Sequence, residues 1–238
     1  IIQDFPPEVA DLYGALEMVA NTIKPLVILV SDEYGVDTIF DLIEHLHGDL
    51  GQGPFCIPYF NPITPLVLNE GTTDKILATI ERGLPFIYNS VGMAGATSPI
   101  TPAGSLALLN AELLAGLVFS QLVKERTPIV LGSLATDFDM RNMQGYYTPR
   151  TLPLNLACAE LMAYYGLPHS GASGSGLGWG ADLLGSATLW MNHLTSCLGK
   201  VGLAPFVGGR FESLVFSSTF TVYANEVVRQ ARLYANGF

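Results

Sequence analysis

Short apolar runs alternate along the chain with longer segments whose apolar positions recur at helical spacing. The runs are apolar on consecutive positions, which is typical of parallel strands that are covered on both faces. Most of them follow a turn signal that contains proline, and proline costs little at the first residue of a strand because no ladder donor is needed there. The pattern predicts strands at residues 1–5, 26–30, 55–60, 85–90, 128–133, 167–171 and 203–208.

The segments between these strands have helical patterns. Pro7 suits the first turn of a helix, and Glu8 after it suits the positive end of the helix. Thr101 can cap a later helix that has Pro102 in its first turn. We expect helices at residues 7–20, 37–47, 72–82, 103–124, 151–165, 179–199 and 219–234.

This alternation predicts a parallel α/β fold, because each gap between strands holds one crossover helix. The strands fall one short of eight, so we interpret the fold as a (β/α)8 TIM-type barrel that lacks its first unit in this chain. An open doubly wound sheet is the competing architecture, but no GxGxxG motif follows the first strand and the even spacing favours the barrel. We treat residues 1–238 as a single α/β barrel domain and as a fragment of a longer protein.

Composition limits the function. Hydrophobic residues make up 49% of the 238 residues and charged residues 13%, so a large buried core is expected rather than disorder. The formal net charge of −10 repels phosphate backbones, and we expect no nucleic-acid partner. The apolar run at residues 103–123 is long enough to span a bilayer, but polar residues interrupt it. We interpret it as a core helix and expect no membrane partner.

The three cysteines are far apart and form no CxxC pair, which favours reduced thiols in a cytoplasmic protein. No signal peptide is visible. The four lysines are expected on helices or in loops at the amino ends of strands, which disfavours a Schiff-base aldolase. The histidines do not show the converging spacing of a metal site. His169 alone lies on a predicted strand, where contact with a ligand and a hydrogen-bonded core role remain equally open.

In either architecture the functional site lies beyond the carboxyl ends of the strands. Two glycine-rich loops begin there, at residues 89–104 and 171–180; they match no nucleotide-binding motif, but their backbones leave room for a large group to approach. The rule selects as candidates Asp4, Ser31, Asp32, Tyr59, Asn61, Asn89, Ser133, Asp139, His169, Arg210 and Glu212.

The stretch from Gly92 to Gly104, GMAGATSPITPAG, resembles a signature of the trimethylamine methyltransferase superfamily. The NPITPL run that starts at Asn61 and the DMR run that starts at Asp139 resemble further blocks of that family, as does the tail around Glu212. The resemblance covers nearly the whole chain. It implies a barrel, a larger parent protein, and transfer of a methyl group from a methylated amine to the cobalt of a corrinoid on a separate partner protein.

Founding members of the family use pyrrolysine, which this sequence does not contain. By resemblance its position falls at Gly176, which favours the branch that takes quaternary amines such as glycine betaine. In that branch His169 resembles a substrate-contacting position. The resemblance also implies that Tyr59, with Asp4 or Glu212, forms a cage for the ammonium. Asn89 would orient the substrate through its amide. The small residues that would admit the corrinoid are Gly95, Gly174 and Gly176.

The resulting hypothesis is a corrinoid-dependent methyltransferase for a quaternary amine. Such a nitrogen already carries the charge that makes the amine a leaving group, which fits the absence of a clear acid–base constellation. The alternative is a non-catalytic barrel subunit that binds a methylated amine. A third possibility, a barrel lyase acting on a carbonyl compound, would need a metal or lysine site that we do not find. An incomplete barrel would expose strand edges, so we also expect a homo-oligomer.

Overall fold

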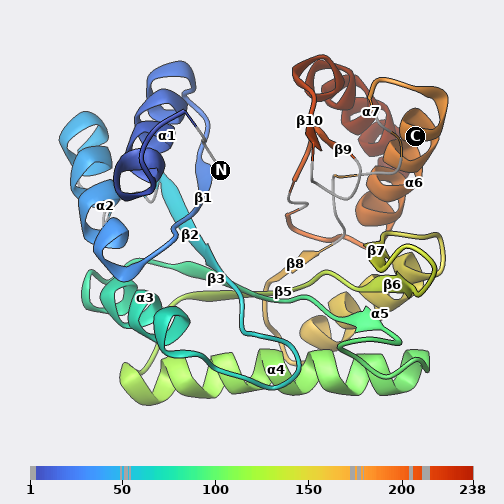
Figure 1. Cartoon of the computed structure of the whole chain (residues 1–238), viewed down its shortest axis with the longest axis horizontal. Helices are drawn as coiled ribbons and strands as arrows, with labels where there is room; N and C mark the ends of the chain where they lie inside the picture. The colour runs from blue at the N-terminus through green and yellow to red at the C-terminus, as the bar shows by residue number, and fades with distance from the viewer. Residues whose placement is uncertain are drawn as a thin grey trace. The chain divides into compact units, whose positions relative to one another are not determined.

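Helices and strands alternate along the chain in a computed structural model that describes residues 4–48, 50, 53, 55–171, 175, 178, 180–203, 206–210 and 215–237 (Figure 1). The helices are α1 (Pro7–Asn21), α2 (Glu33–His47), α3 (Glu70–Glu81), α4 (Pro102–Val123), α5 (Thr151–Tyr164), α6 (Leu183–Leu198) and α7 (Ser218–Asn236). The main strands are β1 (Leu26–Leu29), β2 (Cys56–Phe60), β3 (Phe86–Ser90), β5 (Ile129–Ser133) and β8 (His169–Gly171). The short ones are β4 (Met93–Ala94), β6 (Thr136–Asp139), β7 (Gln144–Tyr146), β9 (Gly209–Arg210) and β10 (Val215–Phe216).

The five main strands form a parallel sheet in the order β1-β2-β3-β5-β8. Strands that are neighbours in this sheet follow one another in the chain, with one long helix in each connection. The fold is therefore mixed α/β with a parallel sheet, as the sequence predicted. A sequential strand order of this kind is compatible with part of a TIM-type barrel.

The chain divides into two compact units, and the division passes through β3, α4 and β5. Unit 1 comprises residues 1–89 and 114–130. In this unit α2 packs against both α1 and α3, and β1 pairs with β2. The core between the helices and the strands is apolar; it includes Ile28, Val30, Phe40, Ile43 and Cys56.

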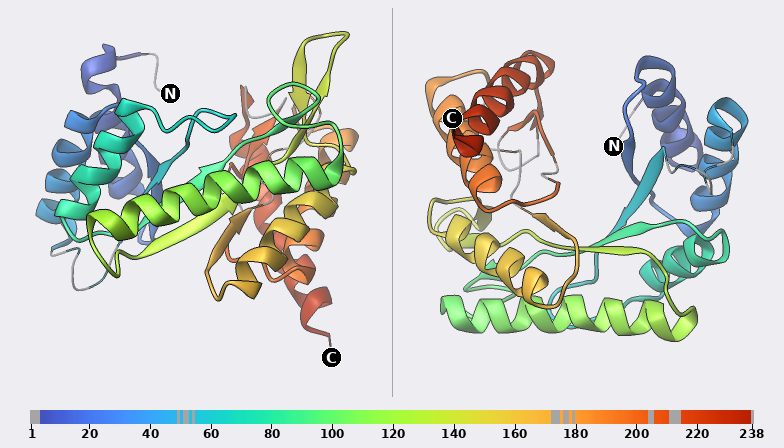
Figure 2. Two further views of the ribbon diagram at one scale, coloured as in Figure 1. Left: turned by 90° about the horizontal axis from the view of Figure 1, so that it is seen from below. Right: turned by 180° about the vertical axis from the view of Figure 1, so that it is seen from behind.

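Unit 2 comprises residues 90–113 and 131–238. In this unit α5 packs against β8, and α6 packs against α7 around Leu189 and Phe220. The loops that follow β3 and β5 are joined in a second sheet with the order β4-β6-β7. Figure 2 shows β6 and β7, in yellow-green, as an antiparallel hairpin.

Helix α4 packs on the sheet despite its composition. Among the described residues it is the one helix long and apolar enough to cross a membrane by these measures alone, and 28% of its most apolar window is buried. Its Gly116 lies under the ring of Tyr88, so close that a Cβ would stand 2.3 Å from that ring. Its Glu112 is buried and accepts a hydrogen bond from Ser90 Oγ. These contacts are those of a helix that covers a sheet.

Most predicted elements are confirmed, with shifted ends. The five main strands coincide with predictions, and α2 begins at Glu33 because Asp32 Oδ1 accepts from Gly35 N and caps the helix. Helix α6 begins at Leu183 rather than at residue 179, again behind an aspartate cap. Of the strand predicted at residues 203–208, Leu203 makes one parallel bridge to Ser170 and residues 207–208 form a turn; residues 204–205 lie outside the described part. Of the strand expected at residues 1–5, Asp4 lies in a bend and residues 1–3 lie outside the described part.

Candidate functional site

Two neighbouring strands of unit 1 bring three polar side chains together where they end. Tyr59 pairs in register with Ile87, so Tyr59 and Asn89 project from the same face of the sheet. Asn89 Nδ2 donates a hydrogen bond to Tyr59 Oη at 2.5 Å. Asn61 Nδ2 donates to the backbone oxygen of Asn89 at 2.9 Å and lies 3.5 Å from Tyr59 Oη. We call Tyr59, Asn61 and Asn89 the amide–phenol cluster.

The amide–phenol cluster is electrically neutral and largely buried. Burial raises the pKa of Tyr59 to about 12, although the hydrogen bonds from Asn61 and Asn89 act in the opposite direction. Asn89 is fully buried, and its Oδ1 has no hydrogen-bond partner among the described residues. Tyr88, next along β3, faces Gly116 of α4, so the cluster lies on the face of β2 and β3 opposite to α4. The cluster therefore offers an unpaired amide oxygen and a protonated phenol.

His169 in unit 2 has a different environment. It stands opposite Leu131 on β5, and its Nε2 lies 3.4 Å from Ser133 Oγ. Ser133 also hydrogen-bonds with Cys158 of α5, so this side of β5 and β8 is the one that α5 covers. His169 Nδ1 has no hydrogen-bond partner among the described residues. We call His169, Ser133 and Cys158 the imidazole cluster.

The position of His169 depends on a glycine two residues later. A Cβ at Gly171 would stand 2.4 Å from Cε1 of the imidazole and 3.1 Å from the carbonyl oxygen of Ser133, so the ring occupies the space that a side chain would need. Burial lowers the pKa of His169 to about 4, which makes the imidazole uncharged at neutral pH. Both interpretations of His169, contact with a ligand and a core role, agree with a neutral buried ring.

Of the other predicted site residues, the structure describes Asp4 and Gly95. Asp4 is exposed in a bend ahead of α1. Gly95 is exposed in the turn after β4, where its φ of +92° and its N–H bond to Ser98 explain why glycine stands there. The remaining three predicted positions lie outside the described residues: Gly174, Gly176 and Glu212.

Two charged residues have roles that the sequence did not reveal. Glu112 was visible only as the single charge in an apolar run, and its burial against Ser90 gives it a partner at the end of β3. Lys75 lies on α3 as expected, but its Nζ donates to the carbonyl oxygens of Val30 and Ser31 at the carboxyl end of β1. The prediction that every lysine lies at the other end of the strands is therefore wrong for Lys75. Burial lowers its pKa, and nearby carboxylates oppose that shift.

Within the described ranges, no group of three or more His, Cys, Asp or Glu side chains could hold a metal ion. The cysteines are free thiols, and burial raises the pKa of Cys56 to about 12 and of Cys158 to about 11. Neither thiol is ionised at neutral pH, so neither is activated as a nucleophile.

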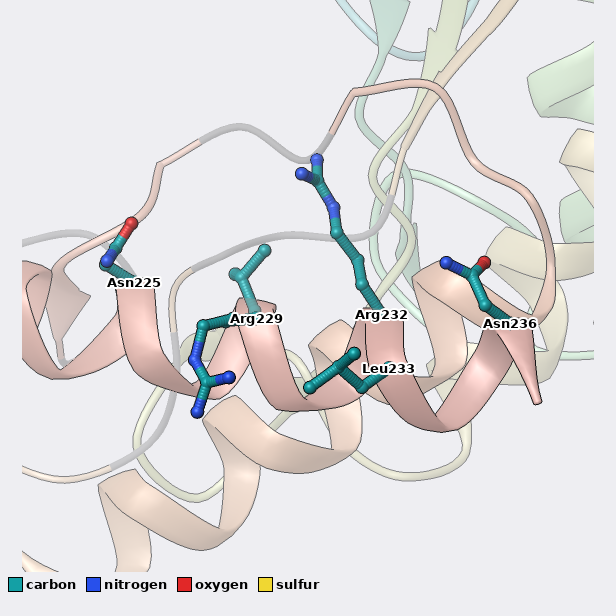
Figure 3. A pocket seen from close by; sticks show the side chains of 6 residues that line it. Asn225, Arg229, Arg232, Leu233 and Asn236 are labelled. Atoms are coloured by element: carbon teal, nitrogen blue, oxygen red, sulfur yellow. The ribbon is translucent and has the colours of Figure 1, made fainter. Parts of the chain in front are cut away.

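Two surface cavities have no residue of either cluster in their lining. One of about 340 Å³ is lined by residues of α1 and α2, including Asp11 and Asp32, whose carboxylates already accept bonds from Ser31 N and Gly35 N. The other, of about 360 Å³, lies along α7 (Figure 3). Figure 3 shows Arg229 pointing away from Arg232, and the Arg229 guanidinium is paired with Glu226. The carboxylates of Asp11 and Asp32 and the Arg229 guanidinium thus have structural partners.

A family model described as trimethylamine methyltransferase (MTTB) matches residues 2–182, which include Tyr59, Asn89 and His169. The chain belongs to the trimethylamine methyltransferase family. The resemblance carried by the sequence motifs is thereby confirmed. Glu212 and α7 lie beyond the matched range.

Relatives in the trimethylamine methyltransferase family carry names for several methylated amines. The chain is 32% identical over 176 residues to trimethylamine methyltransferase MttB of Desulfitobacterium hafniense, a match that covers 72% of this chain and 36% of the relative. It is 30% identical to glycine betaine methyltransferase of the same species, over 74% of this chain and 37% of the relative. It is 26% identical to proline betaine:corrinoid methyltransferase of Eubacterium limosum, over 79% and 39%. The matches span little more than a third of each relative's length.

Proposed function

We propose that this chain is part of a corrinoid-dependent methyltransferase that removes a methyl group from a quaternary amine of the betaine type. Membership of the trimethylamine methyltransferase family supports methyl transfer, and two relatives are named for betaines. The absence of pyrrolysine from the sequence favours a quaternary over a tertiary amine. We also propose that the strands are part of a (β/α)8 barrel, because their sequential order lacks the reversal of a doubly wound sheet.

One observation carries the choice of a quaternary amine: neither cluster at the strand ends holds a group that exchanges a proton near pH 7. The pKa of Tyr59 is about 12 and that of His169 is about 4. General acid–base catalysis works best with a pKa near the working pH. A quaternary ammonium leaves as a neutral amine without taking up a proton. The neutral amide–phenol cluster therefore suits a substrate that needs orientation and exclusion of water rather than proton transfer.

The amide–phenol cluster would hold the cationic end of the substrate. The amide oxygen of Asn89 carries a partial negative charge, and a phenol ring attracts methylated ammonium groups. Asp4 and Glu212 were predicted to add a counter-charge, and that role belongs to the proposal. The role expected for His169, orienting the far end of the substrate, stays a prediction, because within unit 2 its ring lies on the side of β8 that α5 covers.

The corrinoid belongs to a partner protein, and when bound it supplies the nucleophilic cobalt that accepts the methyl group. The groups of this chain that would face it are the small residues predicted at Gly95, Gly174 and Gly176. Gly95 fits this role in one respect, because it is exposed and the nearest atom to an added Cβ is a side-chain carbon of Ile100 at 3.9 Å. At that turn the chain would thus present to its partner protein a surface without a protruding side chain.

The test uses the purified chain with reduced cobalamin and a panel of glycine betaine, proline betaine, choline and trimethylamine. The proposal expects cobalt absorbance to change to that of the methylated form with at least one quaternary amine and to change much less with trimethylamine. Asn89→Ala should lower the rate about tenfold or more, since it removes a group at the cation. Asn21→Ala, at the exposed end of α1, is the matched control and should keep the rate within twofold.

The alternative, a binding subunit without turnover, predicts a different result. Calorimetry would then show binding of a betaine while the cobalt spectrum stays unchanged. Methylation by trimethylamine alone would contradict the quaternary substrate. No binding of any methylated amine would contradict both functions.

A further inference from the structure

Asn61 joins the ends of β2 and β3 through its side chain. It follows the last residue of β2, and Thr72 Oγ1 on α3 donates to its backbone oxygen at 2.9 Å, which fixes the backbone at this point. Its amide nitrogen has two hydrogens. One goes to the backbone oxygen of Asn89 and the other points toward Tyr59 Oη. Asn61 is thus the residue that holds both other members of the amide–phenol cluster.

These two bonds fix the orientation of the Asn89 amide. A phenol oxygen accepts hydrogen bonds, and in this cluster both Asn89 Nδ2 and Asn61 Nδ2 donate to Tyr59 Oη. With Nδ2 of Asn89 committed to the phenol, Oδ1 is turned the other way. It is buried and has no hydrogen-bond partner among the described residues. Leaving such an oxygen unpaired costs on the order of 1–3 kcal/mol, and the attraction of a positive charge would offset part of that cost.

The chemistry of that oxygen selects its ligand. An amide oxygen accepts hydrogen bonds and attracts positive charge, and it repels a carboxylate or phosphate. Asn61 is half-buried whereas Tyr59 and Asn89 are buried, so the ligand would approach from the side of Asn61. The alternative is a purely structural role, in which the cluster only holds β2 against β3. The cluster would then not distinguish a cation from a neutral molecule of the same shape.

We propose that Asn61 is a positioning residue that turns Asn89 Oδ1 toward the cationic group of the ligand and so determines the preference for a charged over an uncharged headgroup. This inference rests on the proposed function for its ligand class, a methylated ammonium. It assigns no chemical step to Asn61. Asn61 acts through the two residues that it holds.

The experiment compares choline with 3,3-dimethylbutan-1-ol, in which carbon replaces the charged nitrogen. Calorimetry with the full chain should show that the wild-type protein binds choline at least tenfold more tightly than the neutral compound. Asn61→Ala should reduce that ratio about tenfold, chiefly by weakening choline. Asn61→Ser, which keeps one donor hydrogen, should restore part of the ratio. Asn21→Ala, at the exposed end of α1, should leave it unchanged.

A purely structural role for Asn61 predicts that both dissociation constants rise together, and an unchanged ratio in a folded Asn61→Ala protein overturns the proposal. A wild-type protein without preference for choline also overturns it. If Asn61→Ala does not fold, as judged by circular dichroism, Asn61→Ser carries the same comparison. Should the wild-type protein show the preference without methylating cobalt, the proposed function fails and the role of Asn61 stands.

Discussion

The amide–phenol cluster and the imidazole cluster both consist of neutral polar groups buried at the ends of parallel strands. They differ in the chemical group whose atom has no hydrogen-bond partner among the described residues. Among the described residues, the atom without a hydrogen-bond partner in the first cluster is the amide oxygen of Asn89, which does not titrate at any physiological pH. That of the second is a nitrogen of His169, a group whose pKa burial has lowered to about 4. A buried polar atom without a hydrogen-bond partner therefore has a different consequence in each cluster. In one cluster it suits a cationic ligand, and in the other it makes folding sensitive to acid.

The largest expected difference between the clusters is in pH dependence. The pKa of His169 falls from 6.5 in the unfolded chain to about 4 in the folded protein, so only the unfolded chain takes up a proton between these values. The stability associated with a neutral His169 is complete above pH 6.5 and is lost as the pH falls toward 4, by roughly 3 kcal/mol. The unfolding free energy of the wild-type protein, measured with urea, should therefore be lower at pH 4.5 than at pH 7. In His169→Asn this decrease should be smaller by about 2–3 kcal/mol.

Asn89→Ala is the control for that measurement, because the amide–phenol cluster has no group that titrates between pH 4 and pH 7. It should leave the pH-dependent drop unchanged. His193 has a pKa lowered to about 4 for the same reason, burial, so its own contribution persists in His169→Asn. An equal drop in wild type and His169→Asn would mean that His169 is not shielded from solvent in the folded protein.

A smaller effect is expected from adding one methyl group beside the imidazole. Gly171→Ala places a Cβ 2.4 Å from the His169 ring and 3.1 Å from a backbone oxygen, so the ring must shift. Overpacking of this kind costs about 2 kcal/mol in unfolding free energy. Gly180→Ala is the matched control, since its Cβ would meet no heavy atom within 4 Å. Equal stabilities of the two variants would show that the imidazole cluster is loosely packed.

The smallest differences are expected from single hydroxyl deletions. Tyr59→Phe removes the acceptor of Asn89 Nδ2 at 2.5 Å and should lower the unfolding free energy by about 1–2 kcal/mol. Ser133→Ala removes a longer contact, 3.4 Å from His169 Nε2, and a bond with a thiol, Cys158, and should cost only about 0.5–1 kcal/mol. Urea titrations at pH 7 measure both. The reverse order would indicate that the imidazole cluster, rather than the amide–phenol cluster, is the more tightly bonded of the two.

The sequence predicted the order of the elements well because consecutive apolar residues and helical spacing are local signals. It placed the start of α2 too late because the apolar pattern begins only at residue 36, whereas the cap at Asp32 sets the first turn. The β6–β7 hairpin was missed because its strands are short and largely polar. The pairing of β6 with β4, in the loop after β3, is a contact between distant segments, which no local pattern signals.

The candidate site was predictable in its residues but not in its contacts. The rule that sites lie at the carboxyl ends of strands selected Tyr59, Asn61 and Asn89 from the sequence. That Asn61 bonds to Asn89 depends on the register of β2 on β3, which pairs Tyr59 with Ile87 and has no signal in the sequence. The neutral state of His169 also had no such signal, because it results from burial under α5.

The pairing of β4 with β6 has a consequence for how this region varies among related proteins. Met93 and Ala94 are aligned with Thr136 and Asp137, and Thr136 N donates to the oxygen of Gly92. The two loops are joined by backbone hydrogen bonds, so a displacement of one loop would also displace the other. An insertion or deletion in one loop must then be matched by a change in the other. Evolution would therefore alter the two loops together rather than one at a time.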